Sequence, residues 1–211
     1  SGRAAKELCA AAEIEVNVKP KSMKPDQMRA LLEAFQGEKM FNGKPVKLLN
    51  PPTNCLSPIE EMLIKKGLSK TIDSRYATTM TRVPNVSLGN PYQVEVGLIF
   101  GGNMAADKPV EVLRFANRVP LMYQQGGCLL TKAIESVDWR QYGLDQPGGK
   151  GVPKGPAAIL VHLASTNVQF TSEAKEALAE NGEVIEEVRK AMLEMGRGLR
   201  KHLETVSYTH L

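Results

Sequence analysis

The run from Ala157 to Ala164 restricts the possible folds of this sequence more than any other feature. It is apolar throughout except for His162. A run of this length is far shorter than the ~20 apolar residues that a helix needs to cross a bilayer. It is instead typical of a strand buried inside a sheet. The chain is therefore predicted to fold around a sheet.

The hydrophobic pattern changes near Arg75, where helical spacing gives way to alternation. Alternating or β-branched runs that Gly and Pro separate predict strands, and apolar residues at a spacing of three and four predict helices. The expected strands are residues 76–81, 93–100, 110–119 and 157–164, and the expected helices are 126–137 and 183–203. We predict an α+β fold in which helices cover one face of a sheet.

Residues 1–70 are predicted to form a small helical module. Helices are expected at 3–14, from Pro25 until Gly37, and at 59–66. Ser57 and Glu60 have the spacing of a capping box for the third helix, and Gly67 is expected to end it. The prolines at 45, 51 and 52 indicate a loop without regular structure before that helix.

Positive charge is concentrated at the front of the chain. Residues 1–80 carry 13 Lys and Arg against 9 Asp and Glu, and the whole chain has a formal net charge of +4. Clustered positive charge favours an anionic partner such as nucleic acid.

The cysteines indicate a reduced compartment. Cys9, Cys55 and Cys128 are far apart and have no partner at zinc-ligand spacing. The first residues lack the charged and then apolar pattern of a secretory signal, and no apolar run is long enough for a membrane helix. We expect no membrane partner.

Two further features have plain structural interpretations. The segment Gly148–Gly155 is glycine-rich and basic, but it matches neither a P-loop nor a dinucleotide fingerprint. A solvated connector is favoured there over a phosphate site. His162 has no accompanying Ser or Cys nucleophile motif, so a satisfied core histidine is favoured over a catalytic base.

Two segments remain ambiguous from their residues alone. The stretch Asp138–Tyr142 contains Trp139, Arg140 and Tyr142, which could stack on bases and pair with phosphate, or could anchor a helix end with Arg140 on the surface. The stretch Thr171–Glu176 is expected to cap a short helix, and its Lys175 either is solvated or faces an anion, with composition favouring the solvated lysine. No paired carboxylates, metal cluster or activated nucleophile can be assembled from the sequence.

Four segments resemble the B subunit of DNA topoisomerase VI, the type IIB topoisomerase of archaea and plants. They are residues 54–59 (NCLSPI), 114–126 (RFANRVPLMYQQG), 136–144 (SVDWRQYGL) and 170–177 (FTSEAKEA). The resemblance implies that residues 1–70 form a helix-two-turns-helix module and residues 75–203 a transducer domain with a ribosomal S5-like fold. It also implies a Bergerat-type ATP-binding domain ahead of residue 1, which would bind ATP and Mg, with no cofactor in this chain.

The same resemblance assigns roles to individual residues. Lys175 matches the transducer lysine that senses the γ-phosphate of ATP, a role suited to a compact cation. Trp139, Arg140 and Tyr142 match a DNA-contacting Trp-Lys-x-Tyr motif, with Arg140 in place of the lysine. Lys65 and Lys66 are expected to contact the DNA backbone from the front module.

The implied function is to couple ATP binding and hydrolysis to DNA strand passage, with cleavage by a tyrosine of the A subunit. The implied partners are DNA, the A subunit and, when ATP binds, a second B subunit. The location would be the archaeal cytoplasm and nucleoid, or a plant nucleus. Alone, the chain is expected to be inactive, and residues 204–211 are expected to be an atypical tail from a truncated or misread reading frame.

Two rival functions remain open from the sequence. An S5-like sheet with basic loops also suits an RNA-binding ribosomal or translation protein. A structural adaptor that never touches nucleic acid is the other alternative, and its binding would not respond to salt.

Overall fold

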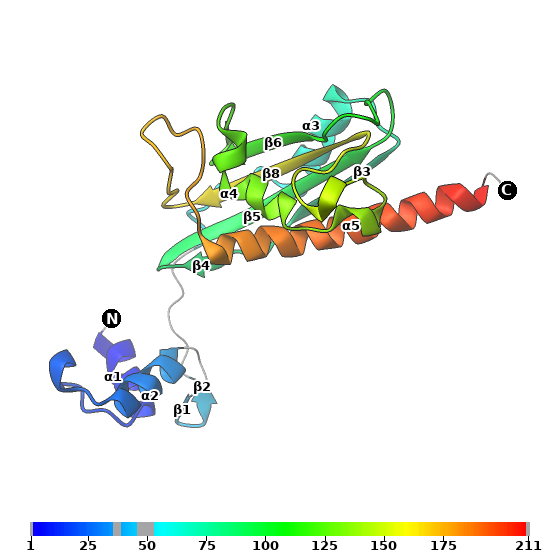
Figure 1. The fold of residues 1–211 in the computed structure, drawn as a ribbon. Coiled ribbons are helices and arrows are strands. Elements are labelled where there is room, and N and C mark those ends of the chain that lie inside the picture. Colours follow the sequence, from blue (N-terminus) through cyan, green and yellow to red (C-terminus); the bar gives the residue numbers. More distant parts are fainter. Residues whose placement is uncertain (1, 36–38, 46–52, 210–211) are drawn as a thin grey trace. The chain divides into compact units, whose positions relative to one another are not determined.

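The computed structural model describes residues 2–35, 39–45 and 53–209. The chain divides into two compact units, Ser1–Asn50 and Pro51–Leu211, which we describe separately. Figure 1 shows the fold of each unit.

The first unit packs two helices around a small core. Helix α1 spans Gly2–Ala11 and α2 spans Pro25–Phe35, with a 3-10 turn at Pro20–Ser22 between them. Their buried contacts centre on Leu8, Ala12, Ile14 and Ala34. Both helices were predicted, and the expected helix end at Gly37 lies outside the described residues.

A short hairpin follows α2, where we expected no regular structure. Strand β1 (Met40–Phe41) pairs with β2 (Lys44–Pro45) across a tight turn. Gly43 adopts a φ of +73° in that turn, which glycine tolerates without strain. The prediction for this part of the loop was wrong because a proline is tolerated on an edge strand. Pro51 and Pro52 lie outside the described residues.

The second unit is built on one mixed sheet. Its strand order is β3-β5-β8-β6-β7, and β4 pairs with the first residues of β5. Strand β5 pairs antiparallel with β3 and β8, whereas β6 runs parallel to β8. The bounds are β3 Tyr76–Thr81, β4 Asn85–Ser87, β5 Asn90–Phe100, β6 Glu111–Ala116, β7 Val119–Pro120 and β8 Ala157–Ser165.

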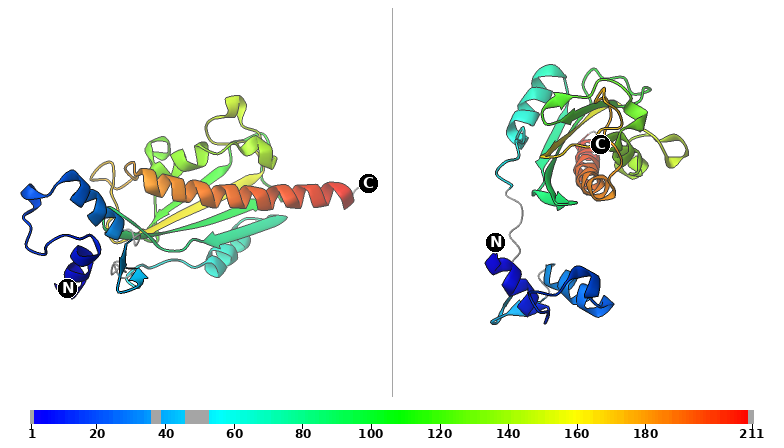
Figure 2. Two further views of the ribbon diagram at one scale, coloured as in Figure 1. Left: turned by 90° about the horizontal axis from the view of Figure 1, so that it is seen from below. Right: turned by 90° about the vertical axis from the view of Figure 1, so that its left-hand side faces the viewer.

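Helices cover both faces of this sheet. The two helices predicted within residues 75–203 share one face, as expected, and a helix predicted as part of the front module covers the other. The helices α4 (Leu129–Glu135) and α5 (Gly182–Thr209) pack on one face, and α3 (Glu61–Thr71) packs on the other. Figure 2 shows the two layers of helices from the side. The apolar run of β8 explains this arrangement: Ile159 and Val161 enter the α5 core, whereas Ala158 and Leu160 enter the α3 core.

Helix α3 begins and ends differently from the prediction. Glu60 precedes the helix at a φ of +81° and makes no side-chain cap, so the capping box does not form. Gly67 lies inside the helix, which continues to Thr71. Because α3 packs on the sheet, it belongs with the second unit, and the division between units falls after Asn50 rather than near residue 70.

The long helix α5 extends through Thr209 and so includes most of the residues expected as a tail. The expected short helix at Thr171 or Ser172 is a turn instead. Between α4 and β8 the chain makes two 3-10 turns, η3 (Trp139–Tyr142) and η4 (Pro147–Gly149). A further 3-10 turn, η2 (Gln125–Gly127), precedes α4.

Candidate functional site

Lys175 lies on the loop that joins β8 to α5. Its backbone N–H donates to the carbonyl of Ser172, and its φ of +55° places it in the left-handed region. The side chain is exposed, and its amine has no hydrogen bond or ion pair with any of the described residues. The amine is therefore free to meet an anion from outside the unit.

Backbone contacts fix this loop on the start of α4. Thr171 N–H donates to the carbonyl of Ala177, and Ala179 N–H donates to that of Gln169. Leu178 receives the Leu129 N–H on its carbonyl and directs its own N–H to the Cys128 sulfur at 3.5 Å. Lys175 is thus held on an anchored loop rather than on a free one.

An ion pair adds to this anchoring at the surface. The Lys132 amine on α4 pairs with the carboxylate of Glu180, next to the start of α5. The hydrogen bond from Lys132 lowers the pKa of Glu180 below its usual value. Both side chains are exposed, so the pair adds little stability. Its effect is to hold the end of the loop against α4.

Helix α5 connects this loop to the η3 turn. The buried ring of Tyr142 packs directly against Gly196, where an added Cβ would lie 2.4 Å from a ring carbon. Gly143 likewise faces the Leu203 side chain. Gly196 lies about 20 Å along the helix axis from Gly182, at 1.5 Å per residue. A displacement of the Lys175 loop would therefore reach η3 through one rigid element.

Trp139 and Tyr142 form a hydrophobic anchor and have no face free for DNA. The Trp139 side chain is fully buried, and its indole N–H donates to the carbonyl of Ile134 at 2.8 Å. Tyr142 is 6% exposed and meets Trp139 edge to face. Burial in the α5 core explains why these two rings do not fit the expected DNA contact.

Arg140 is the exposed member of the η3 motif. Its Nε donates to the Asp138 carboxylate at 2.8 Å, and this hydrogen bond raises the pKa of Arg140 and lowers that of Asp138. The side chain of Arg140 remains more than half exposed. It can still meet a phosphate.

Lys65 and Lys66 lie exposed on α3. They and Arg140 are on opposite faces of the sheet, because α3 covers one face and η3 packs beside α5 on the other. The structure therefore does not bring the two predicted DNA-contact groups together.

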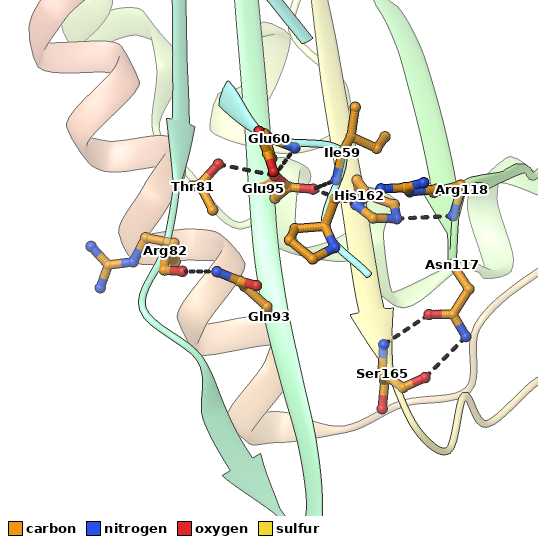
Figure 3. A network of polar contacts seen from close by, with 11 residues as sticks. Ile59, Glu60, Thr81, Arg82, Gln93, Glu95, Asn117, Arg118, His162 and Ser165 are labelled. Atoms are coloured by element: carbon orange, nitrogen blue, oxygen red, sulfur yellow. Dashed lines mark hydrogen bonds and ion pairs between the residues drawn. The ribbon is translucent and has the colours of Figure 1, made fainter. Parts of the chain in front are cut away.

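A buried polar network that the sequence analysis missed joins α3 to the sheet. Figure 3 shows it centred on Glu95 of β5 and His162 of β8, which are register partners and have no exposed surface. His162 Nδ1 lies 2.7 Å from Glu95 Oε2. Its Nε2 accepts the Arg118 N–H at 3.0 Å, so Nδ1 carries the proton and donates to Glu95. His162 is thus a satisfied core histidine.

The carboxylate of Glu95 takes the place of the expected cap. Oε2 accepts the Ile59 N–H at 2.6 Å, and Oε1 accepts the Glu60 N–H at 2.8 Å and the Thr81 hydroxyl at 2.9 Å. Burial by itself raises the pKa of Glu95, but the hydrogen bonds from His162, Ile59, Glu60 and Thr81 outweigh it and hold the pKa below its usual value. The sequence did contain a signal for this network, because Glu95 is an acidic residue at an inward-facing position of a strand with alternating side chains.

Arg114 is a second buried charge that the sequence analysis did not single out. One of its terminal nitrogens donates to the carbonyls of Leu121 and Tyr123, both at 2.9 Å. Its Nε and other terminal nitrogen meet no partner among the described residues. Arg114 thereby fixes the path of the segment that follows β7.

The described residues hold neither a membrane helix nor a metal cluster. Over residues 2–35, 39–45 and 53–209, no helix is long and apolar enough to cross a membrane. In the same ranges no three His, Cys, Asp or Glu side chains gather as a metal site would require.

Comparison with known proteins gives consistent matches over most of the chain. The sequence model of the family described as "Topoisomerase VI B subunit, transducer" matches residues 51–210. This range includes most of residues 204–211, which were expected to be an atypical tail. The chain is similar to the B subunit of type 2 DNA topoisomerase 6 from Methanococcoides burtonii, at 49% identity over 94% of this chain and 30% of that protein. The protein of the same name from Methanosarcina acetivorans is 48% identical over 96% of this chain and 31% of its own length. That from Natronomonas pharaonis is 53% identical over 85% and 21%. The chain spans less than a third of these curated relatives.

Proposed function

Because this chain belongs to the topoisomerase VI B-subunit family, as its match to the transducer model shows, we propose that it couples ATP binding to DNA strand passage. In this proposal a neighbouring domain binds ATP and Mg, and the A subunit cleaves DNA. A second B subunit would pair with the first when ATP binds. The protein would act on DNA in the archaeal nucleoid. The comparisons do not favour an RNA-binding protein of translation.

The exposed and unpaired amine of Lys175 carries the proposal. The anchored loop presents a compact cation that no described residue neutralises. An ammonium placed against a γ-phosphate would stabilise its charge without transferring a proton. Lys175 would therefore report whether the nucleotide has three phosphates.

Helix α5 would transmit this signal. It begins seven residues after Lys175 and packs along the sheet through Val188, Met192, Met195 and Leu199, all at most 1% exposed. A helix buried along one stripe moves as a unit, so a shift at its start would be conveyed toward its end.

Exposed cations would supply the DNA contacts. Lys65 and Lys66 on α3 and Arg140 on η3 remain candidates, because each is exposed. Trp139 and Tyr142 would support Arg140 from the core instead of touching DNA.

A relaxation assay tests the role of Lys175. The chain is joined behind the ATP-binding domain of a related B subunit, combined with an A subunit, and supplied with supercoiled DNA and ATP. Lys175→Met is expected to reduce the ATP-dependent rate by about 10²-fold, as for other preorganised charge-stabilising groups. Lys201→Met, at another exposed lysine, should leave the rate unchanged. Equal rates for the chain with and without Lys175 would refute the sensor role.

Salt dependence tests the DNA contacts separately. Charge reversal at Lys65 and Lys66 together, or at Arg140 alone, should reduce the slope of log affinity against log salt by about one for each phosphate that the protein no longer neutralises. An unchanged slope in both variants would support an adaptor that does not bind nucleic acid.

A further inference from the structure

The first turns of α5 face an open hollow on the side of β4. The hollow has a volume of about 450 Å³ and is lined by residues of β4 and β5 and by the helix between Gly182 and Lys190. The apolar stripe that packs α5 on the sheet begins only at Val184. On the β4 side, polar side chains therefore have to hold the start of the helix in place.

Two neutral hydrogen bonds cross beside this hollow. Asn181 Nδ2 donates to Ser87 Oγ at 3.0 Å, and Asn181 Oδ1 accepts the Val184 N–H at 3.1 Å, so one side chain both caps α5 and ties it to β4. The Tyr92 hydroxyl donates to the carbonyl of Glu183 at 3.4 Å. Neutral hydrogen bonds contribute modestly to stability. A stronger contact is needed to make this end of the helix rigid.

Arg82, directly after β3, makes that stronger contact. Its Nε donates to Glu187 Oε1 at 2.7 Å, and the Glu187 side chain is only 10% exposed. Hydrogen bonds between charged groups are about twice as strong as neutral ones, and a partly buried pair is little screened by salt. The carboxylate of Glu194 lies 3.7 Å from Arg82 Nη1 and about two turns further along α5. One guanidinium thus contacts the helix at two levels.

The backbone of Arg82 is fixed to β5. Its N–H donates to the carbonyl of Val94 at 2.8 Å, and its carbonyl accepts the Gln93 side-chain amide at 2.8 Å (Figure 3). Strand β5 itself pairs with β3, β4 and β8. Because Arg82 cannot shift without breaking these bonds, its ion pair attaches the start of α5 to the sheet.

We propose that Arg82 is a positioning residue that keeps the start of α5 rigid, so that a displacement of the Lys175 loop is passed along the helix. Without the ion pair, the first turns of α5 would absorb such a displacement by opening locally. The inference rests on the proposed function, because it concerns how the Lys175 signal reaches the rest of the unit. Arg82 touches no nucleotide in this proposal.

Hydrogen exchange of the chain alone tests whether Arg82 holds the helix. Arg82→Met should speed exchange of the amides from Val184 to Val188 by at least about tenfold, as expected for a lost hydrogen bond between charged groups. The amides from Met192 to Leu199 should exchange as before. Arg82→Lys retains a cation for the single short contact and should restore slow exchange. Arg189→Met is the matched control, because the pair of Arg189 with Glu186 stays within α5.

A coupled assay tests the positioning role. In the chain joined to a related ATP-binding domain, with an A subunit, DNA relaxation and ATP hydrolysis are measured together. Arg82→Met should lower the number of strand passages per ATP by at least about fivefold, the low end of couplings between sites. The preference for ATP over ADP should stay unchanged, whereas Lys175→Met should reduce it. A merely destabilised protein would lose hydrolysis and relaxation together.

A second variant removes the charge that Arg82→Met leaves without its main partner. Arg82→Met combined with Glu187→Gln has no unpaired carboxylate at this site and should be uncoupled to the same extent. Unchanged exchange at the start of α5 in Arg82→Met would overturn the proposal. Faster exchange with an unchanged number of strand passages per ATP would overturn the positioning role. A joined protein without ATP-dependent relaxation would refute the proposed function, and the exchange rates would still decide whether Arg82 holds the helix.

Discussion

Replacement of Glu95 by Gln should destabilise the second unit strongly although the side chains have the same shape. The carboxylate accepts four hydrogen bonds, from Ile59, Glu60, Thr81 and His162, in a site without solvent exposure. A glutamine keeps one acceptor oxygen, which can still serve Glu60 and Thr81. Its NH₂ group would face the Ile59 N–H and the proton on His162. In each of these contacts two donors would face each other, so no hydrogen bond could form.

The expected cost follows from the donors left unpaired. His162 could move its proton to Nε2, but that would leave the Arg118 N–H without an acceptor. Two buried donors therefore lose their partners in either case, at about 1–3 kcal/mol each. The total is therefore about 2–6 kcal/mol. This is a large part of the 5–15 kcal/mol typical of a domain's stability.

Urea unfolding followed by tryptophan fluorescence measures this cost. The chain has a single tryptophan, Trp139, which is buried in the second unit and so reports on that unit alone. Glu173→Gln, at an exposed glutamate, is the matched control and should change stability by less than about 0.5 kcal/mol. A cost below about 1 kcal/mol for Glu95→Gln would refute the account of this network.

The same network predicts a dependence on pH. The folded pKa of Glu95 lies below its usual value, so its contribution is complete above the unfolded pKa of about 4.3 and is lost as pH falls through the folded pKa. The difference between Glu95→Gln and the unchanged chain should therefore shrink as the solution is acidified below that value. A difference that stays constant from neutral to acid pH would contradict the assignment of a charged carboxylate.

Three further predictions concern packing and burial. Gly196→Ala should destabilise the chain by about 1–3 kcal/mol because its Cβ meets the buried Tyr142 ring, whereas Gly67→Ala should stabilise it by about 0.5–1 kcal/mol. Urea unfolding of both variants measures the two changes. Changes in unfolding free energy of the same sign would contradict the packing described. Trp139→Ala should cost about 3–5 kcal/mol by calorimetry, and a loss of DNA affinity without a loss of stability would restore this residue as a contact. Burial, with Glu187 and Glu183, raises the pKa of Tyr92 to about 12, so Tyr92→Phe should remove an absorbance step near that pH. Removal of a step near pH ~10, the ordinary pKa of tyrosine, would show instead that the phenol is not buried.

Most of the regular elements could be predicted because their signals are local. The strands β3, β5 and β8 and the helix α5 follow from side-chain periodicity, and the structure confirms them with shifts at their ends. The start of α3 could not be predicted in this way. Its cap comes from Glu95, some 35 residues further along the chain, and a capping-box pattern at Ser57 and Glu60 carries no information about that partner.

The candidate site was predicted less completely than the fold. Lys175 was identified through the resemblance to a family. The residues of its own segment favoured a solvated lysine. The sequence left Trp139 open between a DNA contact and a core anchor, since an aromatic next to an arginine is common to both. Only the packing of α5 across η3 decides between them, and this packing joins residues far apart in the chain.

Nucleotide affinity tests the central claim about Lys175 most directly. In the chain joined to a related ATP-binding domain, dissociation constants would be measured for ADP and for a non-hydrolysable ATP analogue, with Lys175 intact and as Lys175→Met. The account predicts that the substitution weakens the triphosphate and leaves ADP unchanged, so that the preference for the third phosphate falls by at least about tenfold. An identical preference in both proteins would contradict it.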